Sequence, residues 1–181
     1  VNPDISSKLF GYKHVLPERP EWYQCACCPP NVARLLTSLG QYVWSESEDT
    51  IYSHLFIGGS SKLELATITL DSRFPWDGDM TYTINPSGAK SEFNLAIRIP
   101  SYVKEYKILC NHLEYTSSID IRDGYCYINR SWEEGDTVQL IFDLPVRRVH
   151  TNTFVRSNIG LVALMRGPIV YCFEGIDNGD N

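Results

Sequence analysis

Hydrophobic residues recur with a helical period in one stretch of this chain. Beyond Asn31 they recur with the spacing of i, i+3, i+4 and i+7, which places them on a single face of an α-helix. The residues with this spacing are Val32, Leu35, Leu36, Leu39 and Val43. The pattern predicts one amphipathic helix that runs to about Trp44 or Ser45.

After residue 46 the pattern changes to short alternating or fully apolar runs. These runs are rich in β-branched and aromatic residues, as in KLELATITL, FNLAIRI and TVQLIFDL, and such runs are typical of β-strands. Turn-forming clusters such as GGSS, NPSGAK and WEEGD separate them. The spacing favours an antiparallel β-sandwich or jelly roll over β-α-β units. The predicted fold is therefore mainly β, with a loop and one helix in front of the sandwich.

The change of period divides the chain into three predicted regions. Residues 1–46 hold the loop and the helix, and residues 47–148 form one antiparallel sandwich with its own core. Residues 149–181 either begin a second sheet or add strands to the first. The sequence opens without an initiator methionine, in a loop-like stretch, and stops just after a strand-like run. We interpret it as a piece of a longer protein.

Composition and charge exclude several classes of function. The chain has 181 residues, 43% hydrophobic and 21% charged, as in ordinary globular proteins. Its net charge of -6, with no basic run longer than Arg147-Arg148, argues against binding to nucleic acid or anionic membranes. No apolar run approaches the roughly 20 residues of a membrane span. A signal-peptide pattern is also lacking, which favours the cytoplasm over secretion, although the native N-terminus is expected upstream.

Three cysteines occupy four positions just before the predicted helix, in the run WYQCACCPPNVAR. Neighbouring cysteines are poorly placed to bridge each other, because disulfide geometry requires a particular separation and direction of the side chains. Bridges to distant cysteines, a metal site, a reactive thiolate and simple burial remain as alternatives.

Cys27 and Cys28 are expected beside the helix N-terminus, whether Pro30 takes its first position or Asn31 caps it. Backbone N–H groups and the positive end of the helix dipole stabilise a thiolate there, and a thiolate is both a nucleophile and a metal ligand. The run could supply two ligands to a tetrahedral Zn²⁺, but the chain has no second cysteine pair with the spacing of structural zinc sites. The pattern favours a functional role over burial or disulfides.

Four other residues have ordinary structural explanations. Cys110, Cys126 and Cys172 are expected in the core, and a bridge between the first two would require an oxidising compartment. Trp76 lies in a turn-like PWDG sequence. It is predicted to plug the sandwich, with an exposed sugar-stacking platform as the alternative.

Several motifs together resemble the C-terminal part of the glycoside hydrolase family 127 enzymes, typified by β-L-arabinofuranosidase. The motifs are CACCPPNVAR followed by a helix, YVWSESEDTIYSHLFIGGSS, FPWDGD, NLAIRIPSY, LPVRRVH and VALMRGPIVYCFE. The resemblance runs over essentially the whole chain, from Asn2 to Glu174. The cysteine-rich run is its most distinctive part.

The resemblance implies a retaining glycosidase that releases L-arabinofuranose from β-L-arabinofuranosides. Residues 1–46 would be the tail of a helical (α/α) barrel that forms the catalytic domain. Cys27 matches the nucleophile, a zinc-bound thiolate, Cys28 matches a second zinc ligand, and Cys25 matches a further cysteine at the site. The remaining zinc ligands, a glutamate and a cysteine two residues apart, and the general-acid glutamate are expected upstream of Val1.

These expectations extend to partners and to the isolated chain. The partners implied are an arabinofuranoside oligosaccharide or glycoconjugate and the missing N-terminal catalytic domain, while an oligomer stays open. The isolated chain is expected to be inactive and to bind zinc weakly or not at all, because two or three thiolates leave a tetrahedral shell incomplete. The alternative is a noncatalytic carbohydrate-binding or structural β-sandwich in which the cysteine cluster is structural.

Overall fold

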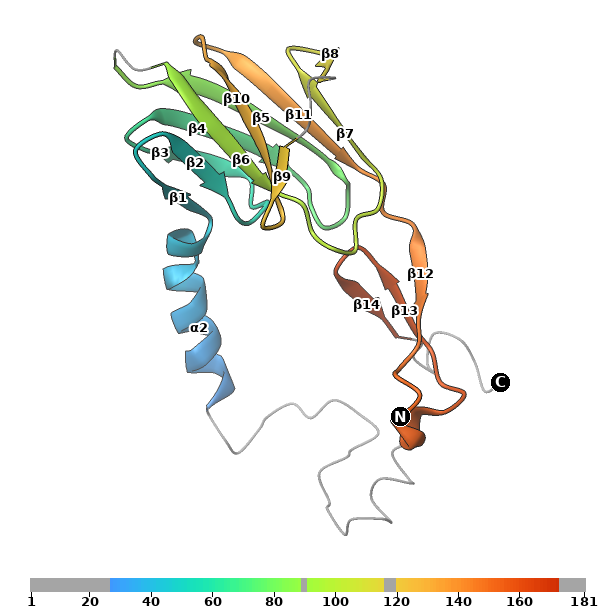
Figure 1. Cartoon of the computed structure of the whole chain (residues 1–181). Helices are drawn as coiled ribbons and strands as arrows, with labels where there is room; N and C mark the ends of the chain where they lie inside the picture. Colours follow the sequence, from blue (N-terminus) through green and yellow to red (C-terminus); the bar gives the residue numbers. More distant parts are fainter. Residues whose placement is uncertain (1–26, 89–90, 116–119, 173–181) are drawn as a thin grey trace. The chain divides into compact units, whose positions relative to one another are not determined.

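A computed structural model describes residues 27–88, 91–115 and 120–172 (Figure 1). The chain divides into two compact units, residues 1–39 and 40–181. In the first unit the described part is helix α2 (Cys28–Ser38), and the short 3-10 helix η1 (Leu39–Tyr42) follows it. No helix in the described ranges is long and apolar enough to cross a membrane.

Helix α2 ends several residues before the predicted end at Trp44 or Ser45. Gly40 is the second residue of η1. A glycine inside an α-helix destabilises it by roughly 1 kcal/mol relative to alanine. Val43 is buried, and Trp44 begins strand β1, where its ring and that of Tyr82 form a T-shaped pair with centroids 6.1 Å apart. The prediction was wrong here because burial in the sandwich takes these two residues away from the helix.

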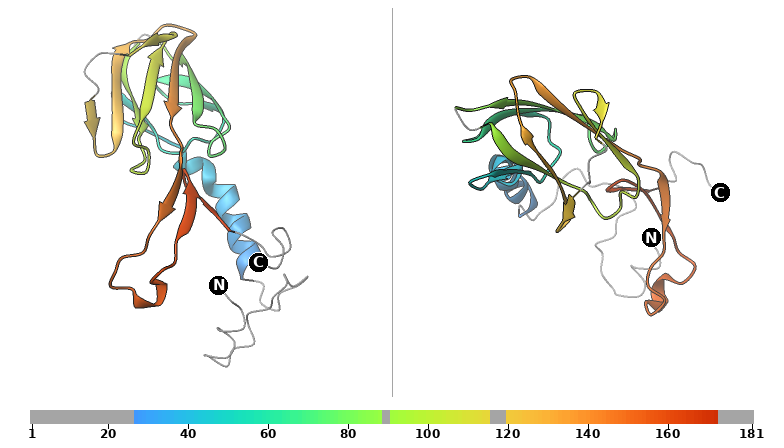
Figure 2. Two further views of the ribbon diagram at one scale, coloured as in Figure 1. Left: turned by 90° about the vertical axis from the view of Figure 1, so that its right-hand side faces the viewer. Right: turned by 45° about the horizontal axis from the view of Figure 1, so that its top comes forward.

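The second unit contains a sandwich of two sheets (Figures 1 and 2). The five-stranded sheet has the order β1-β2-β6-β10-β9. Its strands are β1 (Trp44–Glu46), β2 (Thr50–Ser53), β6 (Glu92–Arg98), β10 (Tyr125–Ser131) and β9 (Asp120–Arg122). β2 and β6 run parallel, with Ile51 opposite Leu95, whereas the other neighbouring pairs in the described sheets are antiparallel.

The six-stranded sheet has the order β3-β4-β5-β11-β7-β8. Its strands are β3 (Gly59–Lys62), β4 (Ala66–Ser72), β5 (Asp79–Pro86), β11 (Asp136–Phe142), β7 (Tyr106–Cys110) and β8 (Leu113–Glu114). Alternate residues of β4, β5 and β11 are buried, the period of two that a half-buried strand requires. The mainly β, largely antiparallel fold predicted from the sequence is confirmed.

The core lies between these two sheets and is filled by large apolar side chains. Those that are almost fully buried include Ile51, Ile68, Tyr82, Phe93, Leu95, Ile128, Trp132 and Leu140. Burial of a side chain of this size stabilises the fold by about 1.5–3 kcal/mol. The indole N–H of Trp132 donates to the Phe93 carbonyl at 3.0 Å. No buried side-chain nitrogen or oxygen in the described ranges lacks a hydrogen-bond partner.

A third, three-stranded antiparallel sheet follows the sandwich, in the order β12-β13-β14. Its strands are β12 (Val146–Val149), β13 (Ala163–Arg166) and β14 (Ile169–Tyr171). The predicted boundary between residues 148 and 149 falls inside β12, which pairs with β13. A second 3-10 helix, η2 (Arg156–Asn158), lies in the loop between these two strands.

Candidate functional site

Cys27 and Cys28 occupy the start of helix α2. Cys27 is the N-cap and Cys28 the first helical residue, so the helix begins two residues before the predicted Pro30. Pro29 and Pro30 are tolerated in this turn because their missing N–H groups would have no acceptor inside the helix. Asn31 therefore lies within the helix and is not its cap.

The two prolines also change the electrostatics of the helix start. A helix leaves its first four N–H groups unpaired, counted from the N-cap, and prolines hold the last two of those four positions here. The N–H groups of Cys27 and Cys28 remain. The first turn carries no acidic residue, so no carboxylate of this turn opposes a thiolate. The N-terminus thus offers an anion fewer backbone donors than the sequence argument assumed.

The two thiols lie close together on the exposed surface of the described unit. Their Sγ atoms are 3.6 Å apart. Two thiolates bound to one tetrahedral zinc, each at about 2.3 Å, stand roughly 3.8 Å apart. The pair therefore fits two adjacent positions of a single zinc shell with little adjustment. No group of three or more potential ligands occurs in the described ranges, and Cys25 lies outside them.

Two polar residues that the sequence analysis did not assign to the site hold the backbone beside the thiols. Asn31 donates from Nδ2 to the Cys27 carbonyl at 2.7 Å, and Arg34 donates from Nη2 to Asn31 Oδ1 at 2.7 Å. The spacing of four and then three residues places all three on one helix face. This spacing is the sequence signal from which their place beside Cys27 could have been predicted.

The buried cysteines are unsuited to nucleophilic chemistry. Cys110 and Cys126 are buried free thiols, which confirms their predicted place in the core and shows no bridge between them. Burial is the main cause that raises the pKa of Cys126 to about 11, with Asp120 and Cys110 adding to it. Burial likewise raises the pKa of Cys110. Both thiols stay protonated at neutral pH, and a protonated thiol is a poor nucleophile.

Cys172 and Trp76 correct two of the predictions. Cys172 is exposed, because it follows β14, an edge strand of a sheet with three strands. Trp76 is 64% exposed and does not plug the sandwich. Its backbone is held in place by bonds from its N–H to the Arg73 carbonyl, at 3.0 Å, and from Arg166 Nη1 to its own carbonyl, at 2.6 Å. The sugar-stacking alternative stays a prediction.

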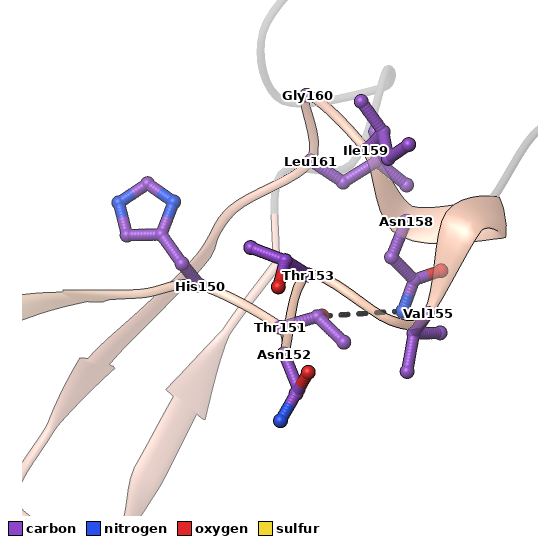
Figure 3. Close-up of a pocket in the computed structure, with 9 residues that line it drawn as sticks. All are labelled: His150, Thr151, Asn152, Thr153, Val155, Asn158, Ile159, Gly160 and Leu161. Atoms are coloured by element: carbon purple, nitrogen blue, oxygen red, sulfur yellow. Dashed lines mark hydrogen bonds between the residues drawn. The ribbon is translucent and has the colours of Figure 1, made fainter.

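A pocket of about 390 Å³ lies in the loop between β12 and β13 (Figure 3). His150, Thr151 and Asn158 are among its lining residues. Within this lining, the Asn158 amide donates to the Thr151 hydroxyl at 3.2 Å. None of the cysteines in the described ranges lines this pocket, and neither Cys27 nor Cys28 belongs to it.

Comparison with known proteins gives the family context. Residues 50–144 match the model of the beta-L-arabinofuranosidase GH127 middle domain, and residues 146–181 match the glycoside hydrolase family 127 C-terminal domain. A non-reducing end beta-L-arabinofuranosidase of Bifidobacterium longum subsp. longum is 38% identical over 173 residues. That alignment covers 91% of this chain and 26% of the relative.

Two solved structures extend the likeness to the fold. A GH127 beta-L-arabinofuranosidase from Geobacillus stearothermophilus T6 has a TM-score of 0.85 at 39% identity, covering 98% of this chain and 28% of the other. A second GH127 beta-arabinofuranosidase has a TM-score of 0.77 at 33% identity, and the match covers 86% of this chain and 27% of the other. The chain thus spans about a quarter of the length of the relatives it matches.

Proposed function

The chain belongs to glycoside hydrolase family 127, and we propose that it is the C-terminal part of a retaining glycosidase that releases L-arabinofuranose from β-L-arabinofuranosides. The observation that carries the proposal is the close pair of thiols, 3.6 Å apart, at the start of a helix. Two of the relatives described above are beta-L-arabinofuranosidases, which supports the choice of sugar.

Cys27 is the proposed nucleophile. Its sulfur attacks the anomeric carbon, the bond from that carbon to the leaving oxygen breaks, and a carboxylic acid protonates that oxygen. Water then attacks the same carbon from the opposite side, gives its proton to the carboxylate, and the carbon–sulfur bond breaks to restore the thiolate. Two inversions give net retention. The carboxylic acid is expected upstream of Val1.

Cys27 and Cys28 are the proposed zinc ligands in this chain, completed by a glutamate and a cysteine upstream, and Cys25 is a further site residue. Bound zinc would keep both thiols deprotonated at neutral pH. The separation of the two sulfurs supports this assignment. With two positions of the shell unfilled, the isolated chain is expected to retain zinc weakly or not at all and to be inactive. Stoichiometric zinc retained through dialysis against a mild chelator would contradict that expectation.

Substitution of Cys27 in the complete polypeptide tests the proposal. Cys27→Ser is expected to lower kcat on an aryl β-L-arabinofuranoside by at least about 10³-fold, because an alcohol is far less ionised than a thiolate. Cys172→Ser is the matched control, since it makes the same change at an exposed cysteine in the third sheet, and it is expected to retain full turnover. Substantial turnover by folded Cys27→Ser enzyme would return the cluster to a structural role.

A noncatalytic carbohydrate-binding role is the second candidate, and the exposed Trp76 ring is the observation that favours it. Sugars pack their apolar faces on exposed aromatic rings. Calorimetric titration of the chain with arabino-oligosaccharides, beside Trp76→Ala, separates the two roles. Binding that disappears with Trp76 supports the second role, and binding unchanged in Trp76→Ala rejects it.

A further inference from the structure

We infer that Asn31 and Arg34 are positioning residues for the thiol pair, acting through the peptide bond between Cys27 and Cys28. This inference rests on the proposed function, and it names two residues that hold the geometry of the proposed zinc ligands. Neither side chain need touch the sugar or the zinc.

The first step is the contact between Asn31 and Cys27. Asn31 Nδ2 donates to the Cys27 carbonyl oxygen at 2.7 Å. That oxygen belongs to the planar peptide unit that joins the two cysteines, and a peptide unit moves as one body. Anchoring it fixes the backbone rotations that place both side chains. The separation of 3.6 Å between the sulfurs therefore depends on where this carbonyl is held.

The second step is the turn that follows. Pro29 and Pro30 have no N–H, so this turn cannot use their backbone to bind an acceptor, while their rings fix φ. In a helix the N-cap carbonyl normally accepts the N–H of the residue four positions along, which is Asn31. The Asn31 side chain reaches the same carbonyl. One residue thus anchors the carbonyl in a turn that the prolines have made rigid but poor in donors.

The third step is the orientation of the Asn31 amide. An amide can present either its oxygen or its nitrogen to a neighbour, and its bonding partners decide which. Arg34 Nη2 donates to Asn31 Oδ1 at 2.7 Å, and since arginine has only donors, the amide nitrogen must face the Cys27 carbonyl. Removal of the guanidinium would free the amide to turn. Arg34 therefore acts through Asn31.

Ordinary helix stabilisation is the competing explanation, and Ser38 offers a matched comparison. Ser38 Oγ also makes side-chain bonds to carbonyls of α2, to Arg34 at 3.0 Å and to Leu35 at 3.1 Å. These bonds do not reach the cysteines. If bonds of this kind only stabilise the helix, Ser38→Ala and Asn31→Asp should change the zinc affinity to a similar extent.

The test measures the zinc dissociation constant of the complete polypeptide by chelator competition, together with kcat and KM. Asn31→Asp keeps an acceptor for Arg34 but loses the donor to Cys27, and it is expected to weaken zinc binding about 10- to 100-fold, as loss of a group that orients metal ligands does. We expect kcat to fall with KM little changed. Arg34→Ala is expected to weaken zinc binding less, Arg34→Lys to restore part of the loss, and Ser38→Ala to match the wild type.

A metal-free probe separates this inference from the proposed function. A trivalent arylarsenoxide binds two close thiols at once, forming two arsenic–sulfur bonds and releasing water, and it needs neither zinc nor turnover. Its affinity is expected to fall about tenfold in Asn31→Asp, because two thiols held ready bind a shared partner more tightly than two that must be brought together. Unchanged zinc and arsenical affinities in Asn31→Asp, or equal losses in Ser38→Ala, would overturn the inference. An active Cys27→Ser enzyme would overturn the proposed function and leave this result standing.

Discussion

The sandwich and helix α2 differ in where their apolar residues are placed. In the sandwich, apolar residues of both sheets, such as Ile51 in β2 and Ile68 in β4, are fully buried in the core. The apolar face of α2 has no buried residue in its own described unit, and Leu35 and Leu36 are 55% and 64% exposed. Both segments carry a regular apolar pattern, but among the described residues only those of the sandwich include the partner that the pattern requires. We expect this face to be covered in the complete polypeptide.

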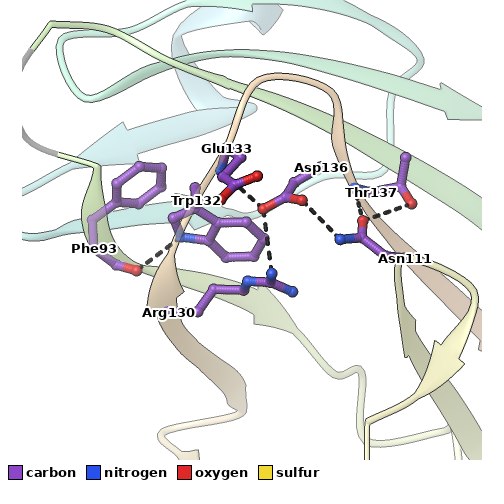
Figure 4. A network of polar contacts seen from close by, with 7 residues as sticks. All are labelled: Phe93, Asn111, Arg130, Trp132, Glu133, Asp136 and Thr137. Atoms are coloured by element: carbon purple, nitrogen blue, oxygen red, sulfur yellow. Dashed lines mark hydrogen bonds and ion pairs between the residues drawn. The ribbon is translucent and has the colours of Figure 1, made fainter.

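The polar groups of the two regions differ in their burial, since Asp136 is buried. In the sandwich, the Asp136 carboxylate accepts from Asn111 Nδ2 at 2.7 Å and from the Glu133 N–H at 2.9 Å, with Arg130 nearby at 3.5 Å (Figure 4). Burial alone would raise the pKa of Asp136, but these three partners outweigh it and hold the pKa below its ordinary value. By contrast, the hydrogen bonds that Asn31 and Arg34 make beside the cysteines lie among exposed residues.

The largest effect is expected from a substitution that leaves a cavity in the sandwich core. Leu140 is fully buried in the central strand β11, so Leu140→Ala is expected to lower the free energy of unfolding of this chain by about 2–5 kcal/mol. Urea denaturation followed by tryptophan fluorescence measures it. A loss below about 1 kcal/mol would show that the core is not packed as described.

A substitution on the apolar face of α2 is expected to affect the stability of this chain and of the complete polypeptide very differently. Leu36→Asp is expected to change the stability of this chain by no more than about 0.5 kcal/mol, because the residue is exposed here. In the complete polypeptide the same substitution is expected to cost about 2–4 kcal/mol, since a charge would enter an apolar contact. Thermal unfolding of both forms checks this. Equal, small effects in both would mean that the α2 face stays uncovered.

A close backbone contact in the sandwich predicts an intermediate effect. A Cβ added at Gly78 would lie 2.1 Å from the Phe142 carbonyl oxygen, and a backbone atom cannot move aside as a flexible side chain can. Gly78→Ala is expected to destabilise the chain by about 1–3 kcal/mol. Gly88→Ala is a control for space, because no atom beyond its chain neighbours lies within 4 Å of its added Cβ, and its positive φ adds a strain unrelated to space. Equal unfolding midpoints for Gly78→Ala and the wild type would contradict the contact.

The smallest expected effect concerns pH. Because the pKa of Asp136 is lower in the folded chain, its contribution to stability is present above the unfolded pKa of about 3.9 and is lost as pH falls through the folded value. Asp136→Asn is expected to cost about 1–2 kcal/mol at pH 7 and to flatten the fall in stability below pH 4. Denaturation midpoints between pH 2 and pH 7 show whether the two curves converge in acid. Parallel curves for the variant and the wild type would show that this carboxylate does not cause the fall in stability in acid.

Alternating apolar positions predicted the sandwich well because both of its sheets lie in the chain. The same reasoning failed where another part of the molecule decided the outcome. Val43 and Trp44 continue the helical spacing, yet packing against the sandwich draws them out of the helix. Trp76 is large and apolar, yet a turn held by backbone bonds leaves its ring exposed. Residue type alone does not determine whether the local pattern or the packing and hydrogen bonds of the surrounding structure decide where a side chain lies.

For the candidate site, the sequence names residues but does not give their geometry. The cysteine run itself pointed to Cys27 and Cys28, and the structure adds their separation of 3.6 Å. The helix start was misplaced, because Pro30 suits the first helical position but is equally tolerated at the third, where its missing N–H also has no acceptor. The roles of Asn31 and Arg34 depend on which side chain reaches which carbonyl, and sequence spacing alone does not decide that.

The central claim is that Cys27 attacks the sugar, and covalent trapping in the complete polypeptide tests it most directly. Incubation with a mechanism-based furanoside electrophile, followed by intact mass measurement and peptide mapping, locates the covalent bond. The account predicts a single added sugar on Cys27, and no label in Cys27→Ser enzyme, while Cys172→Ser enzyme is labelled like the wild type. A label on a carboxylate, or labelling that persists after Cys27 is replaced, would contradict the thiolate mechanism.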